Sequence, residues 1–150
     1  MPHAVPPTAD HDDAFFWDGV AEGRLLVRSC AACHRLQHPP SPMCPHCGSL
    51  EWTVQEMSGR GTLHSWVQSK HPTEPDDTAR IVALVELEEG VRIVSNLHAI
   101  ELANVENDMA LEVVFVDVDG VRLPQFQPVT VGRCRTFLQA TIRTMVLVST

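Results

Sequence analysis

The sequence predicts a mainly β protein with an N-terminal helix, a metal-bound ribbon and a small five-stranded barrel. Three observations lead to this fold class: two closely spaced cysteine pairs, apolar alternation after residue 57, and short helical periodicity before residue 23. Hydrophobic residues make up 44% of the 150 residues, which is enough for a buried core. We predict four segments: an arm and helix (1–27), the ribbon (28–52), the barrel (53–128) and a C-terminal extension (129–150).

The N-terminal residues 1–13 are rich in Pro, His and Asp. They have no basic start and no apolar run, so they do not form a secretory signal. No run of about 18 apolar residues is present, so we expect no membrane span. We therefore expect a cytoplasmic protein with reduced thiols. The net charge of −8 argues against free nucleic acid as a partner, because such binding depends on neutralising phosphates.

Helical spacing relates Ala14, Trp17, Val20 and Ala21. Asp13 stands at the expected N-cap of this helix, and Gly23 is expected to end it. The run from residue 25 to 27 then predicts a short strand that leads into the cysteine segment.

Cys30, Cys33, Cys44 and Cys47 form two C-x2-C pairs separated by ten residues. Each pair can place two thiolates on one side of a tight turn, and two such turns complete a tetrahedral zinc shell. His34 and Gly48 occupy the matching positions after each pair, where a positive φ is often needed. Four protein ligands leave no open position for water, so one structural zinc without a catalytic role is predicted.

Two other interpretations of the cysteine pairs are weaker. The string Cys30-Ala31-Ala32-Cys33-His34 matches c-type haem attachment, which needs export. The string Cys44-Pro45-His46-Cys47 matches an oxidising dithiol motif, which opens a helix in an α/β domain. A second pair at ribbon spacing explains both coincidences, so zinc is favoured.

After residue 57 the pattern is that of short strands separated by turn residues. The predicted strands are Thr62–Ser69, Arg80–Leu87, Val91–Leu97, Leu111–Val118 and Val121–Phe126. Residues 70–79 are predicted as a polar loop and 98–108 as a turn or short helix. Five strands at this spacing fit a small closed barrel.

The tail from about residue 130 differs from the rest of the chain. Its charge comes from Arg133, Arg135 and Arg143 alone, whereas residues 1–129 carry 8 basic and 19 acidic residues, a net −11. Apolar residues at helical spacing predict an amphipathic basic helix, which would dock on an acidic partner or on the acidic domain. The alternative is a partly ordered extension. Cys134 stands in this tail without a neighbouring carboxylate.

Helix, ribbon and barrel in this order resemble the zinc-ribbon/OB-fold, acyl-CoA-associated family that was long described as a domain of unknown function. The resemblance runs from about Phe15 to Pro128. It rests on Phe16-Trp17-Asp18-Gly19, Gly23-Arg24-Leu25-Leu26, Cys30-x-x-Cys33, Pro39-Pro40, Cys44-Pro45-x-Cys47-Gly48, Gly59-Arg60-Gly61-Thr62, Val82–Leu87 with Gly90, and Leu123-Pro124-Gln125-Phe126. Asp108 departs from the pattern, because the family usually has Gly there, and the tail lies outside it.

The resemblance implies a rubredoxin-like ribbon followed by an OB-fold barrel. It also implies a non-catalytic accessory subunit that joins a thiolase-like aldolase, a thiolase or a hydratase acting on CoA thioesters, in some systems during steroid side-chain degradation. In such proteins the N-terminal helices and the barrel contact the catalytic partner, and the ribbon–barrel unit is proposed to bind the CoA thioester.

The residues allow these roles. Phe15, Phe16 and Trp17 are adjacent on a short helix, so all three cannot face one core, and one or two are predicted to protrude as anchors for a partner. The alternative is that all three cap the barrel or ribbon.

Arg60, Lys70 and Arg80 are candidate cations for an anionic CoA tail, or ordinary surface cations. Trp66 is expected to fill the barrel rather than stack on adenine. Two competing functions are a nucleic-acid-binding ribbon and barrel, which would need a basic groove, and a thiol enzyme that uses Cys134.

Overall fold

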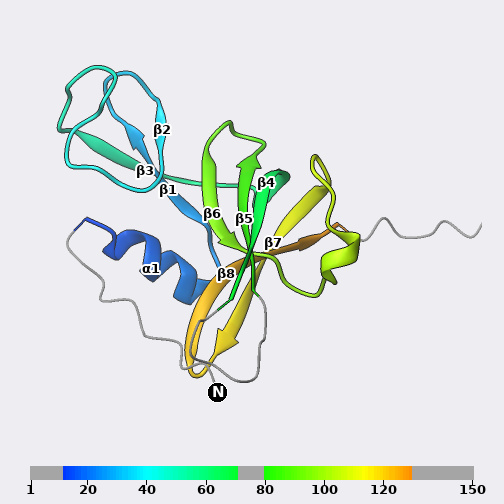
Figure 1. Ribbon diagram of the computed structural model, residues 1–150. Helices are drawn as coiled ribbons and strands as arrows, with labels where there is room; N and C mark the ends of the chain where they lie inside the picture. Colours follow the sequence, from blue (N-terminus) through cyan, green and yellow to red (C-terminus); the bar gives the residue numbers. More distant parts are fainter. Residues whose placement is uncertain (1–11, 71–79, 130–150) are drawn as a thin grey trace, which may run out of the picture.

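The computed structural model describes residues 12–70 and 80–129 (Figure 1). In chain order the elements are α1 (Ala14–Glu22), β1 (Leu26–Cys30), β2 (Leu36–Gln37), β3 (Trp52–Glu56), β4 (Arg60–Ser69), β5 (Arg80–Leu87), β6 (Arg92–Asn96), the 3-10 helix η1 (Leu102–Asn104), β7 (Ala110–Val118) and β8 (Val121–Pro128). The fold is mainly β, as predicted. The predicted polar loop, except Lys70, and the predicted tail helix lie outside the described residues.

Helix α1 has the predicted limits. Gly23 ends it in the left-handed region at φ 77°, and the amide of Arg24 donates to the Gly19 carbonyl at 2.8 Å. Asp13 occupies the N-cap position, but its carboxylate makes no hydrogen bond to a helix amide. It instead accepts a hydrogen bond of 3.2 Å from the indole Nε1 of Trp17, one turn later. The helix therefore starts where the sequence predicts, without the usual side-chain cap.

The ribbon is a three-stranded antiparallel sheet in the order β2-β1-β3. Strand β1 pairs with β3 from Leu26 opposite Glu56 to Cys30 opposite Trp52. The predicted strand before the cysteines therefore exists and carries the first zinc ligand at its last position. In Figure 1 the ribbon extends from the barrel, and α1 lies alongside both.

The barrel is a five-stranded sheet in the order β6-β5-β4-β7-β8, and all five predicted strands are present. It is nearly closed where β6 and β8 approach each other. Leu97 forms a parallel bridge with Phe126, and the His98 amide donates to the Phe126 carbonyl at 2.7 Å. The hydroxyl of Ser95 donates to the Pro124 carbonyl at 2.6 Å. This connectivity and near closure are those of an OB-fold.

Two glycines at the start of the barrel permit close approach of backbones. A Cβ on Gly59 would lie 2.3 Å from Cγ1 of Val113, and a Cβ on Gly61 would lie 2.4 Å from the carbonyl oxygen of Glu86. Side chains at either position would force β4 away from its neighbours. The Gly-Arg-Gly sequence is therefore a packing requirement of the barrel.

Asp108, the departure from the family pattern, has φ 64°. The left-handed region suits Gly best, and Asp is among the residues that tolerate it. The turn before β7 thus keeps its conformation with a different residue. Asp119 and Gly120, at φ 52° and 81°, form the tight turn between β7 and β8.

One core joins the three parts of the fold. It contains Phe16 and Val20 of α1, Leu25 just before β1 and Val27 within it, and the interior of the barrel, where Leu63, Val85, Leu111 and Phe126 are among the buried residues. The prediction that Trp66 fills the barrel is wrong, since this side chain is 37% exposed. It lies on the second half of β4, beyond the Arg60–Thr62 segment that pairs with β7, so β7 does not pair with this part of the strand.

Candidate functional site: the zinc ribbon and the helix–ribbon–barrel pocket

The four predicted zinc ligands converge at the tip of the ribbon. Their Sγ atoms all lie within 4.8 Å of one another, with Cys30 and Cys47 at 3.5 Å and Cys33 and Cys44 at 3.7 Å. Four sulfurs placed tetrahedrally about zinc at about 2.3 Å lie about 3.8 Å apart. The sulfur positions therefore fit a single zinc ion.

Two turns with the same backbone pattern hold the cysteines. The His34 amide donates to the Cys30 carbonyl and the Gly48 amide to the Cys44 carbonyl, both at 2.9 Å. His34 and Gly48 have φ of 58° and 74°, as the sequence predicts for the residue after each pair. The repeated geometry confirms that each C-x2-C pair forms a zinc knuckle.

The knuckle amides favour thiolate at the first cysteine of each pair. Amides of Cys33 and then Ala32 lower the pKa of Cys30 to about 6, although burial opposes them. The amides of Cys47 and His46 likewise lower the pKa of Cys44. Amide donors that point at sulfur stabilise the ionised ligand that zinc requires.

Cys47 completes the set, and its pKa shifts in the opposite direction from those of Cys30 and Cys44. The Ser49 amide lowers its pKa, but the hydrogen bond to Cys30, burial and the thiols of Cys33 and Cys44 together raise it to about 12. Four thiolates this close are stable together only around a cation. The donor set thus fits a structural zinc, and its four protein ligands leave no position for a reacting water.

The three adjacent aromatics of α1 have different surroundings. Phe16 is buried in the core, while Phe15 and Trp17 are partly buried and pack against its edge. Trp17 meets Phe16 edge to face, with ring centroids 5.1 Å apart. Of the three predicted anchors, Phe15 and Trp17 keep exposed surface and Phe16 does not, and their role in binding a partner stays a prediction.

Arg28 of β1 connects the helix with the ribbon. Its guanidinium carbon lies 5.4 Å from the ring centroid of Phe15 and 5.7 Å from that of Trp52. It donates to the Ser41 carbonyl at 3.3 Å and pairs with Asp12 at 3.4 Å. Because its side chain is only 13% exposed, these contacts fix the orientation of α1 on the ribbon.

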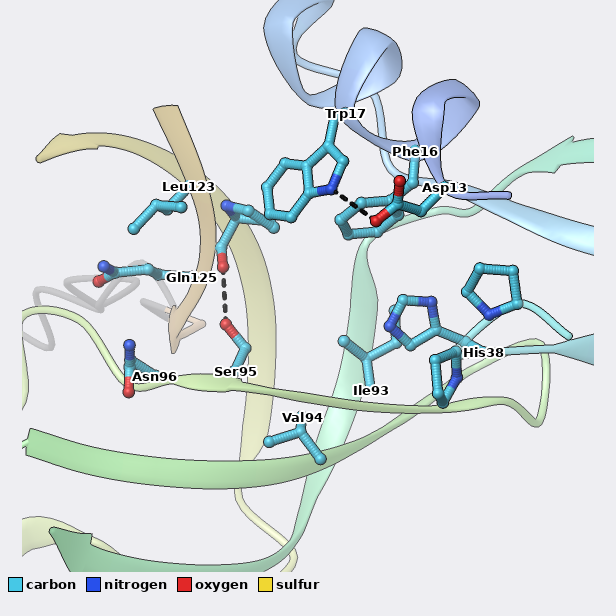
Figure 2. Close-up of a pocket in the computed structure, with 13 residues that line it drawn as sticks. Asp13, Phe16, Trp17, His38, Ile93, Val94, Ser95, Asn96, Leu123 and Gln125 are labelled. Atoms are coloured by element: carbon cyan, nitrogen blue, oxygen red, sulfur yellow. Dashed lines mark hydrogen bonds between the residues drawn. The ribbon is translucent and has the colours of Figure 1, made fainter. Parts of the chain in front are cut away.

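A pocket of about 360 Å³ lies where α1, the ribbon and the barrel meet (Figure 2). Its lining comes from four segments: Asp13, Phe16 and Trp17 of the helix region; His38, Pro39 and Pro40 of the ribbon; Ile93 to Asn96 of β6; and Leu123 to Gln125 of β8. In Figure 2, Trp17 lies at the top of this space, Ser95 with its hydrogen bond to the Pro124 carbonyl at the lower left, and His38 at the lower right. The size is typical of a small-molecule site.

His38 is the titratable side chain that sequence reasoning did not select for this pocket. Its ring lies 5.1 Å from the ring of Phe16, and burial lowers its pKa. The spacing of the histidines gives no indication of this position. The prolines that follow His38 are the one indication in the sequence that the loop between the cysteine pairs has a restricted conformation.

The three predicted cations do not form one cluster. Arg60 begins β4, whereas Arg80 pairs with Ser69 at the other end of that strand, next to Lys70. Ten strand residues separate these ends by about 30 Å. Arg60 and the Lys70–Arg80 end of the barrel are therefore separate candidate sites.

Comparison with known proteins agrees with this architecture. Residues 17–53 match the family model for the ChsH2 rubredoxin-like zinc ribbon domain, and residues 54–116 match that for the ChsH2 C-terminal OB-fold domain. A DUF35 domain-containing scaffold protein of Methanothermobacter thermautotrophicus is 34% identical over 116 residues, which cover 70% of this chain and 86% of that protein. The chain belongs to the ChsH2/DUF35 family.

Solved structures support the same assignment. A chain of the Ltp2-ChsH2(DUF35) aldolase is 39% identical, with a TM-score of 0.74 over 81% of this chain and 98% of that one. A DUF35 protein of Sulfolobus solfataricus, 13% identical with a TM-score of 0.59, shares the fold over 80% of this chain and 87% of that one.

Two longer relatives also match this chain. A probable enoyl-CoA hydratase alpha subunit of Thermomonospora curvata is 40% identical over 124 residues, and a 3-oxo-4,17-pregnadiene-20-carboxyl-CoA hydratase alpha subunit of Mycobacterium tuberculosis is 36% identical over 123. Each match covers 81% of this chain but 39% of the relative. The ChsH2/DUF35 unit here thus corresponds to about two fifths of those subunits.

Proposed function

We propose that this ChsH2/DUF35 protein is a non-catalytic accessory subunit of a cytoplasmic enzyme complex that acts on CoA thioesters. The observation that carries the proposal is the 39% identity and TM-score of 0.74 to a chain of the Ltp2-ChsH2(DUF35) aldolase, of which 98% is covered. The catalytic partner would be a thiolase-like aldolase or thiolase, with a hydratase as the other candidate.

The chemistry of the described residues supports an accessory role. Within residues 12–70 and 80–129, the four cysteines are the one group of side chains placed to hold a metal ion. Four cysteine ligands would occupy all the coordination positions of a zinc ion there, and the bound ion would stabilise the ribbon. Nowhere in those ranges does a helix reach the length and hydropathy that crossing a bilayer needs.

The proposed partner surface centres on α1. Phe15 and Trp17 are partly buried aromatics at the edge of the core on opposite sides of α1, and the buried ring of Phe16 packs against Trp17, so the surface would extend around the helix. Aromatic residues are common anchors at protein interfaces. Arg28 and the Asp13 carboxylate hold the two rings in place, so little side-chain entropy would be lost when a partner binds.

A CoA thioester would find separate candidate cations at the two ends of the barrel. Lys70 and Arg80 lie together at one end, and Arg60 lies at the other. The hydratase relative of M. tuberculosis acts on a steroid-derived acyl-CoA, which favours a steroid side-chain substrate for the complex proposed here.

The test is native mass spectrometry of complexes purified from the protein's own host at natural expression level. We expect one zinc per chain and a thiolase-sized subunit or a hydratase in the same assembly. A double variant Phe15→Ala/Trp17→Ala should lose the partner while keeping zinc. The control is Leu102→Ala, which removes an exposed apolar side chain from η1. A chain that emerges alone, or with nucleic acid, would contradict the proposed function.

A further inference from the structure

A second hollow, on the opposite side of α1 from the pocket in Figure 2, combines an apolar floor with an acidic rim. It lies between α1 and the edge strand β3 and has a volume of about 410 Å³. Its floor consists of Phe15, Leu26 and Val54, and Val54 is 50% exposed although it is a large aliphatic residue. We call this hollow the acidic groove.

The rim of the acidic groove carries three carboxylates and one guanidinium. Asp18 and Glu22 project from α1, and Glu56 projects from the end of β3. Arg24 pairs with Glu56 at 2.9 Å and with Glu22 at 3.2 Å. Three negative charges against one positive charge give the lining residues a net charge of −2, whereas Arg28 over the ring of Phe15 and Arg122 at the Ala21 carbonyl border the groove without lining it. The carboxylates of the lining favour an occupant that is apolar on one face and basic on its flanks.

The same chain contains a segment of that chemistry. Residues 130–150 carry three arginines and no acidic residue, and Leu138, Ile142 and Met145 recur at i, i+4 and i+7. This is the pattern of a helix that lays an apolar stripe into a groove. By contrast, the pocket in Figure 2 has a single charged lining residue, Asp13, and offers no comparable match for three arginines.

The length of the tail also fits. The N-terminal part of β8 lies beside the groove, because Arg122 donates from Nη1 to the Ala21 carbonyl at 2.9 Å and Glu22 is the next residue. From Arg122 to Pro128 the strand covers about 20 Å. Residues 130–136 could span about 23 Å if extended, which is enough to run back along β8 to the level of Arg122. Residue 137 and the apolar stripe after it would then reach the groove.

We propose that residues 137–146 dock as an amphipathic helix in the acidic groove of their own chain. The apolar stripe would cover Val54 and Phe15, and the arginines would face the carboxylates on the rim. Because Phe15 also belongs to the proposed partner surface, a docked tail would compete with a catalytic partner for this side of α1. The docking itself depends only on the groove and the tail, so it stands or fails independently of the proposed function.

The experiment uses the full zinc-loaded chain with a nitroxide on Cys134, the one cysteine outside the zinc set. In heteronuclear NMR spectra, the amides of Asp18, Gly19 and Val54 should lose intensity relative to the reduced label. The loss should disappear in Asp18→Arg, and also after the tail arginines are replaced together by Glu. The matched control Glu101→Arg makes the same charge change at an exposed position near η1, and it should keep the loss.

Three results would overturn the proposal. Broadening centred on Val94 and Leu123 would place the tail in the other pocket, and no selective broadening would show that the tail does not dock. In an equal mixture of nitroxide-labelled chains and isotope-labelled chains without nitroxide, broadening of the isotope-labelled amides would assign the groove to a second copy. Zinc content is measured in each sample, so that damage to the ribbon is not mistaken for loss of docking.

Discussion

The guanidinium of Arg122 donates a hydrogen bond to the carbonyl of Ala21, 101 residues earlier in the chain. Ala21 lies in the last turn of α1, where carbonyl groups lack partners within the helix and the helix dipole is negative. The same guanidinium carbon lies 5.7 Å from the ring centroid of Phe115. A strand of the barrel thus caps the helix that precedes the ribbon.

Replacing Arg122 by Ala should therefore loosen α1 from the barrel. Because the side chain is exposed, we expect the free energy of unfolding to fall by only about 1 kcal/mol, measured by urea denaturation of the zinc-saturated protein. The control Arg92→Ala breaks an exposed pair with Glu86 and should cost roughly half of that or less. Equal losses of unfolding free energy for the two variants would show that the contact with Ala21 stabilises the fold no more than an exposed ion pair does.

Removing one zinc ligand should unfold the ribbon selectively. In Cys44→Ser we expect zinc loss and rapid amide exchange across residues 30–47, because metal binding of this kind supplies roughly 10–16 kcal/mol of folding free energy to a small ribbon. Exchange in β5 and β7 should change far less. Met43→Ala, at the neighbouring exposed position, is the control. Normal protection of residues 30–47 in the Cys44 variant would refute a metal-dependent ribbon.

The glycine pair at the start of the barrel offers a test of packing. Gly61→Ala places a Cβ 2.4 Å from the Glu86 carbonyl oxygen, so β4 and β5 must separate locally. We expect the free energy of unfolding to fall by about 2–3 kcal/mol. Gly90→Ala meets nothing within 4 Å but has a φ of +81°, and backbone strain alone should cost about 1 kcal/mol. A smaller loss at Gly61 than at Gly90 would contradict the close approach.

The buried imidazole of His38 predicts a dependence of stability on pH. Burial lowers its pKa in the folded protein, so the unfolded chain binds the proton first as the pH falls. Stability is therefore complete above the unfolded pKa of about 6.5 and declines below it, by at most about 1.4 kcal/mol at pH 5.5.

His38→Phe should remove this part of the decline between pH 7.5 and 5.5. The measurement is denaturant unfolding with zinc content checked at each pH, since protons also compete for the cysteine ligands. His64→Phe, which changes a histidine that is 44% exposed on β4, is the matched control. The same pH dependence in wild type and in His38→Phe would show that the pKa of His38 does not differ between the folded and unfolded chains.

Local features of the fold could be predicted from the sequence, because they depend on neighbouring residues. The cysteine pairs, His34 and Gly48 define the two knuckles through spacing and backbone preference alone, and alternation defines the strands. Trp66 was placed wrongly, because its burial depends on which strands cover the second half of β4. Alternation gives the face of a strand but not whether anything lies against it.

The pocket and the contacts that orient α1 could not be predicted in the same way. Phe16, His38, Ser95 and Leu123 meet only after helix, ribbon and barrel have packed together. No sequence pattern singles out Arg28 or Arg122, and only the fold shows that one lies near two aromatic rings and the other at a helix end. Such contacts come from side chains far apart in sequence, which no short pattern records.

The seam that closes the barrel has a mechanical consequence. Ser95, Pro124 and their neighbours on β6 and β8 both join the barrel and form a wall of the pocket in Figure 2. A molecule bound in the pocket would contact both β6 and β8 and so stabilise the contacts between them. Separation of these two strands would in turn enlarge the pocket. Ligand binding and closure of the barrel are therefore coupled. A compound that binds beside Trp17 should raise the melting temperature of the barrel as a whole, including strands that it does not contact.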